Sequence, residues 1–259
     1  MDTSEIIKKI KEKKSLNQTD NNLVLEKVNN YLKQKKIDIT KLNLRSADFK
    51  KIIKEVRNEL NRIYGCFNLD NKFSLESNSS TKERIKIYQR LYKNIFAITG
   101  EPKTIVDLSC GFNPLSYKFI PSKCDYIVSE LNKSDCDRLK NYFEREGLNA
   151  KVIQIDLSKE TNLPSGDVCF LFKILESIEQ KGHKIAERII KTLKCRFIVV
   201  SFSTKTLRGN KMKFPRRIWF EVMLKRLGME YERLDYENEL FYIINKQQYR
   251  LQAYKIKPV

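Results

Sequence analysis

The stretch TIVDLSCGFNPLS (104–116) decides the fold. Its apolar start is typical of a buried strand, and the residues after Asp107 form a turn into a helix, which Pro114 can open at its first position. A doubly wound fold often carries a glycine-rich phosphate loop at this place, but this turn has only Gly111. The turn therefore indicates a ligand that is recognised without an anion cradle.

Downstream of this turn the hydrophobic pattern alternates between strands and helices. Helical segments at 133–146 and 176–194 lie among further apolar runs, and the tail 229–246 predicts two more strands in a hairpin. The remaining runs, which suit strands buried on both faces, are 125–129, 151–155, 167–172 and 197–202. This order predicts an α/β fold with a parallel, doubly wound sheet.

Upstream of the turn the pattern is helical. Apolar residues recur at helical spacing over 6–10, 24–32 and 50–63. Ser80 and Glu83 resemble a capping box that opens a helix through Phe96. We therefore expect an α-helical domain over 1–97 and a Rossmann-like domain over 98–259.

The composition limits the function classes. A formal net charge of +19 indicates a polyanionic partner, with a merely charged surface as the alternative. The single histidine, His183, lies in a polar helix start, so we expect it at the surface and expect no Ser-His-Asp triad elsewhere. One histidine also excludes a two-histidine metal site, and the six cysteines form no Cys-x-x-Cys pair, so we expect no metal. No apolar run suits a membrane helix or signal peptide, so we expect a cytoplasmic protein without membrane contact.

Three acids lie at the ends of the first three predicted strands: Asp107 closes the first, Glu130 closes the second and Asp156 follows the third. Asp107, Glu130 and Asp156 should lie at one edge of the sheet, because parallel strands end together. Alone, each would more often be a helix cap or a solvated loop residue. Together they suit ribose hydroxyls and an adenine amino group, and they tolerate a cationic sulfonium. S-adenosylmethionine is such a ligand, and the Arg84 guanidinium could bind its carboxylate.

Several motifs resemble one family. NSSTKER (78–84), DLSCGFNPLS (107–116), FLFKILESIE (170–179), VSFSTKTLRG (200–209) and IWFE (218–221) are similar to those of the aminoglycoside-resistance 16S rRNA (guanine-N7) methyltransferases, the ArmA/RmtB-like group. IYGCF (63–67) and NELFYI (238–243) extend the resemblance over most of the chain. The resemblance implies an N-terminal RNA-binding region, a methyltransferase domain and S-adenosyl-L-methionine as cofactor.

The resemblance also implies a set of cofactor contacts. Asn78 replaces a usual histidine, and Glu130 replaces a usual aspartate while keeping the carboxylate. The implied contacts are Phe67, Asn78, Ser79, Ser80, Arg84, Ser109, Glu130, Asp156, Leu157 and Phe172. Asp107 and Gly111 join this set from their place in the strand and turn.

A basic loop follows the fifth predicted strand. The segment 203–217 contains no acid, and its cations suit phosphate contacts better than a merely solvated face. These cations are Lys205, Arg208, Lys211, Lys213, Arg216 and Arg217.

Four residues are candidates for positioning the target base. Trp219 could stack on an extruded base or anchor a helix to the sheet, and Lys173 could line the target pocket or form a buried ion pair. Phe112 and Asn113 adjoin the cofactor turn. Because guanine N7 carries no proton, positioning is sufficient and no general base is needed.

The sequence thus favours a monomeric enzyme that methylates guanine N7 of 16S rRNA within the small ribosomal subunit, near the decoding site. The SFS sequence (201–203) replaces the family's SFP, which leaves the target nucleotide open. The alternatives are a methyltransferase for another RNA base, an RNA-binding assembly protein on the same scaffold, and a small-molecule methyltransferase. A cysteine nucleophile at Cys110 is disfavoured, because that residue lies inside the cofactor turn.

Overall fold

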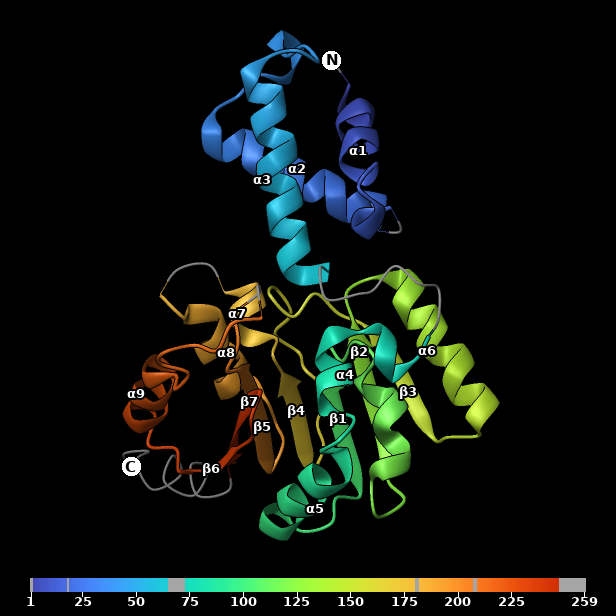
Figure 1. The fold of residues 1–259 in the computed structure, drawn as a ribbon, viewed down its shortest axis with the longest axis vertical. Coiled ribbons are helices and arrows are strands. Elements are labelled where there is room, and N and C mark those ends of the chain that lie inside the picture. Colours follow the sequence, from blue (N-terminus) through green and yellow to red (C-terminus); the bar gives the residue numbers. More distant parts are fainter. Residues whose placement is uncertain (1, 18, 65–72, 180–181, 207–208, 247–259) are drawn as a thin grey trace, which may run out of the picture. The chain divides into compact units, whose positions relative to one another are not determined.

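The chain divides into two compact units in a computed structural model (Figure 1). The described residues are 2–17, 19–64, 73–179, 182–206 and 209–246. The first unit comprises Met1–Lys82 with Asn132–Ser134, and the second comprises Glu83–Leu131 with Asp135–Val259. The second unit therefore starts earlier than the boundary at residue 98 that the sequence suggests.

The first unit is built on three helices, α1 (Thr3–Lys11), α2 (Asn21–Lys35) and α3 (Ala47–Tyr64). Asp2 and Asp20 cap α1 and α2 by accepting backbone N–H groups. Short 3-10 turns η1 (Lys14–Leu16), η2 (Ile39–Lys41) and η3 (Leu75–Ser77) complete the unit. The apolar positions recognised in the sequence form its core, with Ile6, Ile10, Val24 and Val28 buried.

The second unit contains a seven-stranded sheet in the order β3-β2-β1-β4-β5-β7-β6. Strands β1 to β5 are parallel, and β7 pairs antiparallel with β5 and β6, as the sequence predicted. Their bounds are β1 (Thr104–Leu108), β2 (Asp125–Glu130), β3 (Ala150–Gln154), β4 (Val168–Phe172), β5 (Phe197–Ser203), β6 (Tyr231–Asp235) and β7 (Glu239–Asn245). The strand order reverses between β1 and β4, and open sheets of this kind bind ligands at such a switch point.

Two helices directly precede the sheet, beginning with α4 (Ser79–Arg84), and the others connect its strands. They are α5 (Tyr88–Thr99), η4 (Asn113–Phe119), α6 (Lys133–Glu146), α7 (Leu175–Ile178), α8 (Lys184–Thr192) and α9 (Ile218–Arg226). Two predicted helices are interrupted. The chain bends between α4 and α5, and Gly182 and His183 have positive φ between α7 and α8. The Glu179 carboxylate then accepts the Ala186 N–H at 2.9 Å, so α8 starts afresh.

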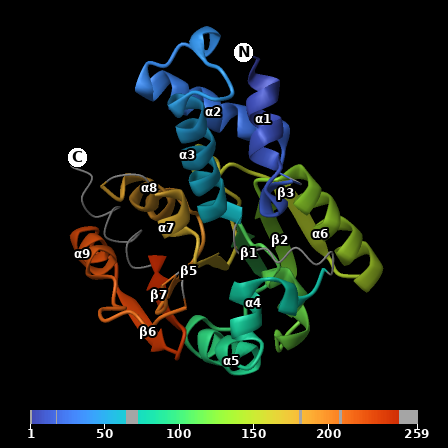
Figure 2. The same cartoon turned by 45° about the horizontal axis from the view of Figure 1, so that its top comes forward.

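Both faces of the sheet are covered, as in a Rossmann-like fold (Figures 1 and 2). One face packs on α8 and α9, and its core includes Leu171, Ile198, Ile189 and Phe220. The other face packs on α5 and α6, since the Tyr92 ring lies 5.9 Å from Phe170 and the Tyr126 ring lies 6.2 Å from Phe143. Burial on both sides explains why the central strands form continuous apolar runs.

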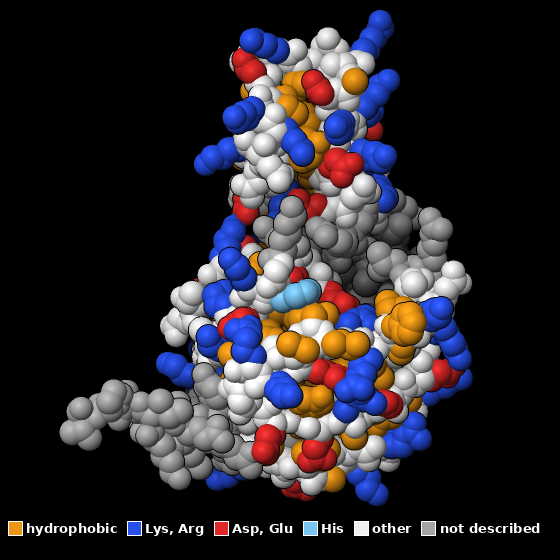
Figure 3. All heavy atoms as spheres, turned by 90° about the vertical axis from the view of Figure 1, so that its left-hand side faces the viewer, with side chains coloured by type: hydrophobic (Ala, Val, Ile, Leu, Met, Phe, Trp, Pro, Cys, Tyr) orange, Lys and Arg blue, Asp and Glu red, His pale blue; other side chains and the backbone are white. Residues whose placement is uncertain are grey.

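Basic side chains are spread over the visible surface of each unit (Figure 3). Among the described residues, no helix has the length and apolar character that a membrane crossing requires. The five described cysteines are free and buried, as expected from the absence of Cys-x-x-Cys spacing.

Candidate functional site

The turn after β1 is fixed by the end of β2. The Ser109 and Cys110 N–H groups donate to the side chain and the carbonyl of Ser129, at 3.2 and 3.1 Å. The Gly111 N–H donates to Glu130 Oε1 at 2.5 Å. Ser109 and Gly111 both have positive φ. Glycine adopts this conformation without strain, which explains why the single glycine of the turn stands at position 111. Three successive amides are therefore used inside the protein, so the turn is not an anion cradle.

Glu130 ends β2 with a buried carboxylate. Its Oε1 accepts the Gly111 amide, and its Oε2 accepts the Leu131 amide at 3.2 Å. Burial raises the pKa of Glu130 to about 7, despite the Gly111 hydrogen bond, and the nearby Asp135 adds to the shift. Each oxygen retains capacity for a further donor, which suits a pair of ligand hydroxyl groups.

The buried Asp107 carboxylate binds side chains of β2 and η4. Its Oδ2 accepts the Tyr126 hydroxyl at 2.7 Å and the Asn113 amide at 2.8 Å. Within the described part of the chain, its buried Oδ1 has no hydrogen-bond partner. Burial raises the pKa of Asp107 to about 6. Asn113 is buried too and accepts the Tyr88 hydroxyl at 2.9 Å, so both ends of its amide hold neighbouring elements together.

Arg84 is buried and faces a carboxylate of the protein itself. Its Nε and one terminal nitrogen donate to the two oxygens of Glu239, both at 2.8 Å. The other terminal nitrogen lies 3.5 Å from Asn113 Oδ1, and the guanidinium carbon lies 4.9 Å from the centre of the Phe172 ring. Glu239 thus holds one edge of the Arg84 fork, and the remaining edge has donor capacity.

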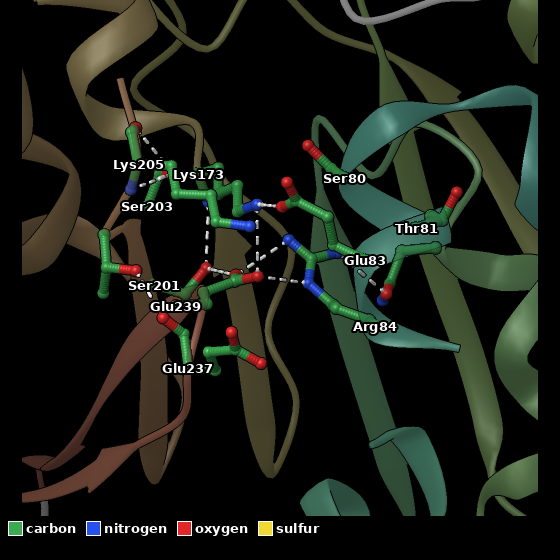
Figure 4. A network of polar contacts seen from close by, with 12 residues as sticks. Ser80, Thr81, Glu83, Arg84, Lys173, Ser201, Ser203, Lys205, Glu237 and Glu239 are labelled. Carbon is green, nitrogen blue, oxygen red and sulfur yellow. Dashed lines mark hydrogen bonds and ion pairs between the residues drawn. The ribbon is translucent and has the colours of Figure 1, made fainter. Parts of the chain in front are cut away.

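Lys173 extends this network (Figure 4). It follows β4 with a positive φ, and its ammonium lies 2.7 Å from Glu83 and 3.4 Å from Glu239. Ser201 also donates to Glu239. Burial alone would raise the pKa of Glu239, but Arg84 and Lys173 outweigh it and lower that pKa. Lys173 therefore forms the ion pairs that the sequence allowed, and its place in the target pocket stays a prediction.

Asp156 and its neighbours lie at the end of β3. Asp156 Oδ1 accepts the Ser158 amide at 3.0 Å, and the Lys159 ammonium lies 3.3 Å from Oδ2. Burial works against ionisation, but the Ser158 and Lys159 contacts outweigh it and lower the pKa of Asp156. Leu157 and Phe172 are buried beside these strand ends. Asp107 lies near the end of β1, Glu130 ends β2 and Asp156 follows β3, so the three acids belong to the carboxyl ends of neighbouring strands, as predicted.

The other predicted contacts are placed as follows. Asn78, Ser79 and Ser80 belong to the first unit, where the Asn78 side chain accepts the Ser80 N–H at 2.9 Å. Phe112 is buried next to the turn. Phe67 and Arg208 lie outside the described residues.

The basic loop contains two kinds of cation. Arg217 is buried and binds Glu176 at 2.6 Å, and Arg216 binds Glu221 at 2.7 Å. These acids come from outside the loop, so the sequence alone did not indicate the pairs. Lys211 and Lys213 are exposed, and in the described ranges neither forms an ion pair. Lys205 is half-buried and pairs with Lys211 in an isolated β-bridge.

Trp219 is half-buried against the core of the sheet. Its ring lies 5.8 Å from Phe202 and stacks on the exposed His183 ring at 3.8 Å. The anchoring role is therefore visible, and base stacking by Trp219 stays a prediction.

Comparison with known families gives the site its context. The profile of the family described as "Ribosomal RNA methyltransferase (FmrO)" matches residues 67–243. The chain belongs to this family. The match includes the turn, the strand-end acids, Arg84, Glu239 and the basic loop, so the residues described above are part of the shared domain of the rRNA methyltransferases.

Relatives in this family are distant. A 16S rRNA (guanine(1405)-N(7))-methyltransferase of Frankia casuarinae is 25% identical over 178 residues, which are 67% of this chain and 63% of that protein. One of the same name from Micromonospora rosea is 28% identical over 64% of this chain and 62% of that protein. The matched part thus spans less than two thirds of these relatives. The structure of the 16S rRNA methyltransferase RmtF, in complex with S-adenosyl-L-homocysteine, aligns with a TM-score of 0.76 over 95% of this chain and 99% of that chain, at 20% identity.

Sequence reasoning missed several residues of this candidate site. Glu239 and Ser201 were not singled out, although Glu239 holds Arg84, and Ser129 was not recognised as the residue that fixes the turn. An acid at the start of a strand, within NELFYI, was the one available signal for Glu239.

Proposed function

We propose that this protein is an S-adenosyl-L-methionine-dependent methyltransferase that acts on guanine N7 of 16S rRNA within the small ribosomal subunit, near the decoding site. The observation that carries the proposal is the strand-end site. A turn without an anion cradle lies beside a buried carboxylate, within a chain that belongs to the rRNA methyltransferase family.

The residues of the second unit fit the cofactor. Glu130 has acceptor capacity on both oxygens for the ribose hydroxyls, and Asp156 can accept from the adenine amino group. Arg84 can bind the carboxylate of the methionine part through the edge that Glu239 leaves unused. The Oδ1 of Asp107, which has no hydrogen-bond partner among the described residues, supplies a further buried acceptor near the turn.

Methyl transfer to guanine N7 mainly requires the protein to position the base and the cofactor. The cofactor supplies an electrophilic methyl group, and guanine N7 supplies an in-plane lone pair without a proton. The chain therefore has to hold the base in line with the methyl group and exclude water. No residue has to remove a proton from N7. Burial raises the pKa of the Cys110 thiol well above its usual range, which disfavours a covalent cysteine mechanism.

Charge supports RNA as the substrate. The net charge of +19 and the exposed Lys211 and Lys213 suit a phosphate backbone. The names of the relatives point to the same base and the same RNA.

A direct test uses tritiated S-adenosylmethionine with the purified full chain and small ribosomal subunits. We expect the label to enter 16S rRNA at one guanine, mapped by chemical cleavage at 7-methylguanine and primer extension. Glu130→Ala is the matched control and should lose most transfer at limiting cofactor. Label in another base, or equal transfer to short unstructured RNA, would contradict the proposal.

A further inference from the structure

An apolar stripe is exposed on the second unit. Among the described residues, four large hydrophobic side chains are more than half exposed. Three of them lie within nine residues of one another, namely Phe214 at 78%, Ile218 at 66% and Val222 at 58% exposure. A spacing of four places Ile218 and Val222 on one face of α9, and Phe214 precedes that helix.

The fold itself does not use this stripe. Helix α9 packs onto the sheet through Phe220, Met223 and Leu224, which are buried. Ile218 and Val222 lie on the opposite, solvent side of the helix. Three large apolar side chains together in water are unfavourable, and such a patch commonly marks an interaction surface.

The charges around the stripe are positive. Lys211 and Lys213 are exposed, and the Lys213 ammonium lies 5.4 Å from the centre of the Phe214 ring. The nearby acids Glu221 and Glu187 are already paired with arginines. Figure 3 shows hydrophobic side chains gathered beside the histidine on one side of the second unit, with both basic and acidic side chains around them.

We propose that Phe214, Ile218 and Val222, together called the α9 stripe, dock onto ribosomal RNA. In this contact the Phe214 ring stacks on an unpaired base, while Lys211 and Lys213 contact the flanking phosphates. Ile218 and Val222 pack against the neighbouring nucleotide. The inference rests on the proposed function, because it takes RNA as the substrate.

The exposed Phe214 ring lies beside the Lys213 ammonium, which forms no ion pair within the described ranges, and this combination favours RNA over a protein partner. Stacking platforms for single-stranded nucleotides combine these two features, because every base has a flat face and a phosphate beside it. Lysine, in contrast, is depleted in protein–protein interfaces. The α9 stripe thus provides a contact additional to the cation contacts of the loop.

Substitutions of Phe214 in the full chain test the stacking. Phe214→Ala should weaken binding to small ribosomal subunits about 5- to 150-fold, the range for one lost base stack. Phe214→Leu keeps much of the apolar area but has no aromatic face, so it should lose nearly as much, whereas Phe214→Trp should keep the affinity. Parental affinity in Phe214→Leu would overturn the proposal.

Photo-crosslinking identifies the partner directly. With p-azidophenylalanine at position 214, we expect a crosslink to 16S rRNA that ribonuclease removes, and the exposed Glu232 on β6 serves as the control position. A crosslink to a ribosomal protein, or none above the Glu232 control, would overturn the RNA assignment. Methyl transfer by the unsubstituted chain is measured in parallel, so that failure of the proposed function is seen separately.

Discussion

The strand-end site and the basic loop differ in how their charged side chains are placed: those of the site are buried and paired, whereas the lysines at positions 211 and 213 of the loop are exposed. Arg84, Glu239 and Glu130 are buried, and each has a defined partner at hydrogen-bond distance. Lys211 and Lys213 are exposed and unpaired within the described ranges. A buried charge fixes geometry, because leaving it without its partner is costly. An exposed charge acts through water and is weakened by salt.

Breaking the buried Arg84–Glu239 pair should give the largest loss of stability. Glu239→Ala leaves the Arg84 guanidinium buried without its carboxylate, so we expect a loss of about 3–5 kcal/mol in the free energy of unfolding. Urea unfolding of the full chain measures it. Cofactor affinity should fall as well, because Arg84 loses its orientation.

The control for this change is an exposed pair of the same unit. Arg226 binds Glu187 at 2.6 Å with a largely exposed guanidinium, so Arg226→Met should change the free energy of unfolding far less than Glu239→Ala does. Equal losses in the two variants would remove the distinction between buried and exposed charge.

Glu130 gives a prediction for pH. Its pKa is about 7 in the folded protein, against an ordinary value of 4.5. The carboxyl therefore contributes stability that is present below pH 4.5 and is lost as pH rises through about 7. Glu130→Gln removes this dependence, so relative to the parent it should gain up to about 3 kcal/mol between pH 4.5 and pH 8. Thermal melts without cofactor measure the gain, and calorimetry at pH 8 should show weaker cofactor binding.

Asp156 should respond with the opposite sign. Its pKa is lowered in the folded protein, so its carboxylate contributes stability above pH 3.8 that is lost as pH falls through the folded value. Asp156→Asn should therefore be less stable than the parent at pH 7, and the difference should shrink on acidification. A difference that is constant with pH would show that ionisation of Asp156 is not coupled to folding.

The exposed loop cations should contribute to the salt dependence of binding to small ribosomal subunits. Lys211→Gln with Lys213→Gln removes two unpaired charges, so the slope of log affinity against log salt for small subunits should fall by about 2 at most. Cofactor affinity should stay at the parental value. Arg216→Gln is the comparison, since Arg216 is already paired with Glu221 and should change the slope less. An unchanged slope in the double variant would place the RNA contacts elsewhere.

The smallest effect is expected at Cys110. Its thiol is buried, which raises the thiol pKa, so we expect no nucleophilic role for Cys110. Cys110→Ala should change the methyl-transfer rate by less than about tenfold, whereas loss of a covalent nucleophile costs several orders of magnitude. Single-turnover transfer measures this change. A collapse of the rate with folding and cofactor binding intact would revive the cysteine mechanism.

The parallel strands and the terminal hairpin could be predicted because burial on two faces leaves a continuous apolar run. The acids could be placed at one edge because parallel strands end together. Glu239 could not be placed at this edge in the same way. Strand β7 is antiparallel, so the first residue of the strand, rather than the last, reaches the edge. Its partner Arg84 is also 155 residues away. The break before α8 depends on two successive positive φ angles and the Glu179 side chain, which no hydrophobic period encodes.

The three amides bonded to the end of β2 have a consequence for ligand binding. Ser109, Cys110 and Gly111 lose their conformational freedom when the sheet forms, not when a ligand arrives. A ligand that contacts this turn therefore meets a surface already in its final shape. Association then carries little ordering entropy for these residues, and the selectivity of the turn is set by the neighbouring strand rather than by the ligand.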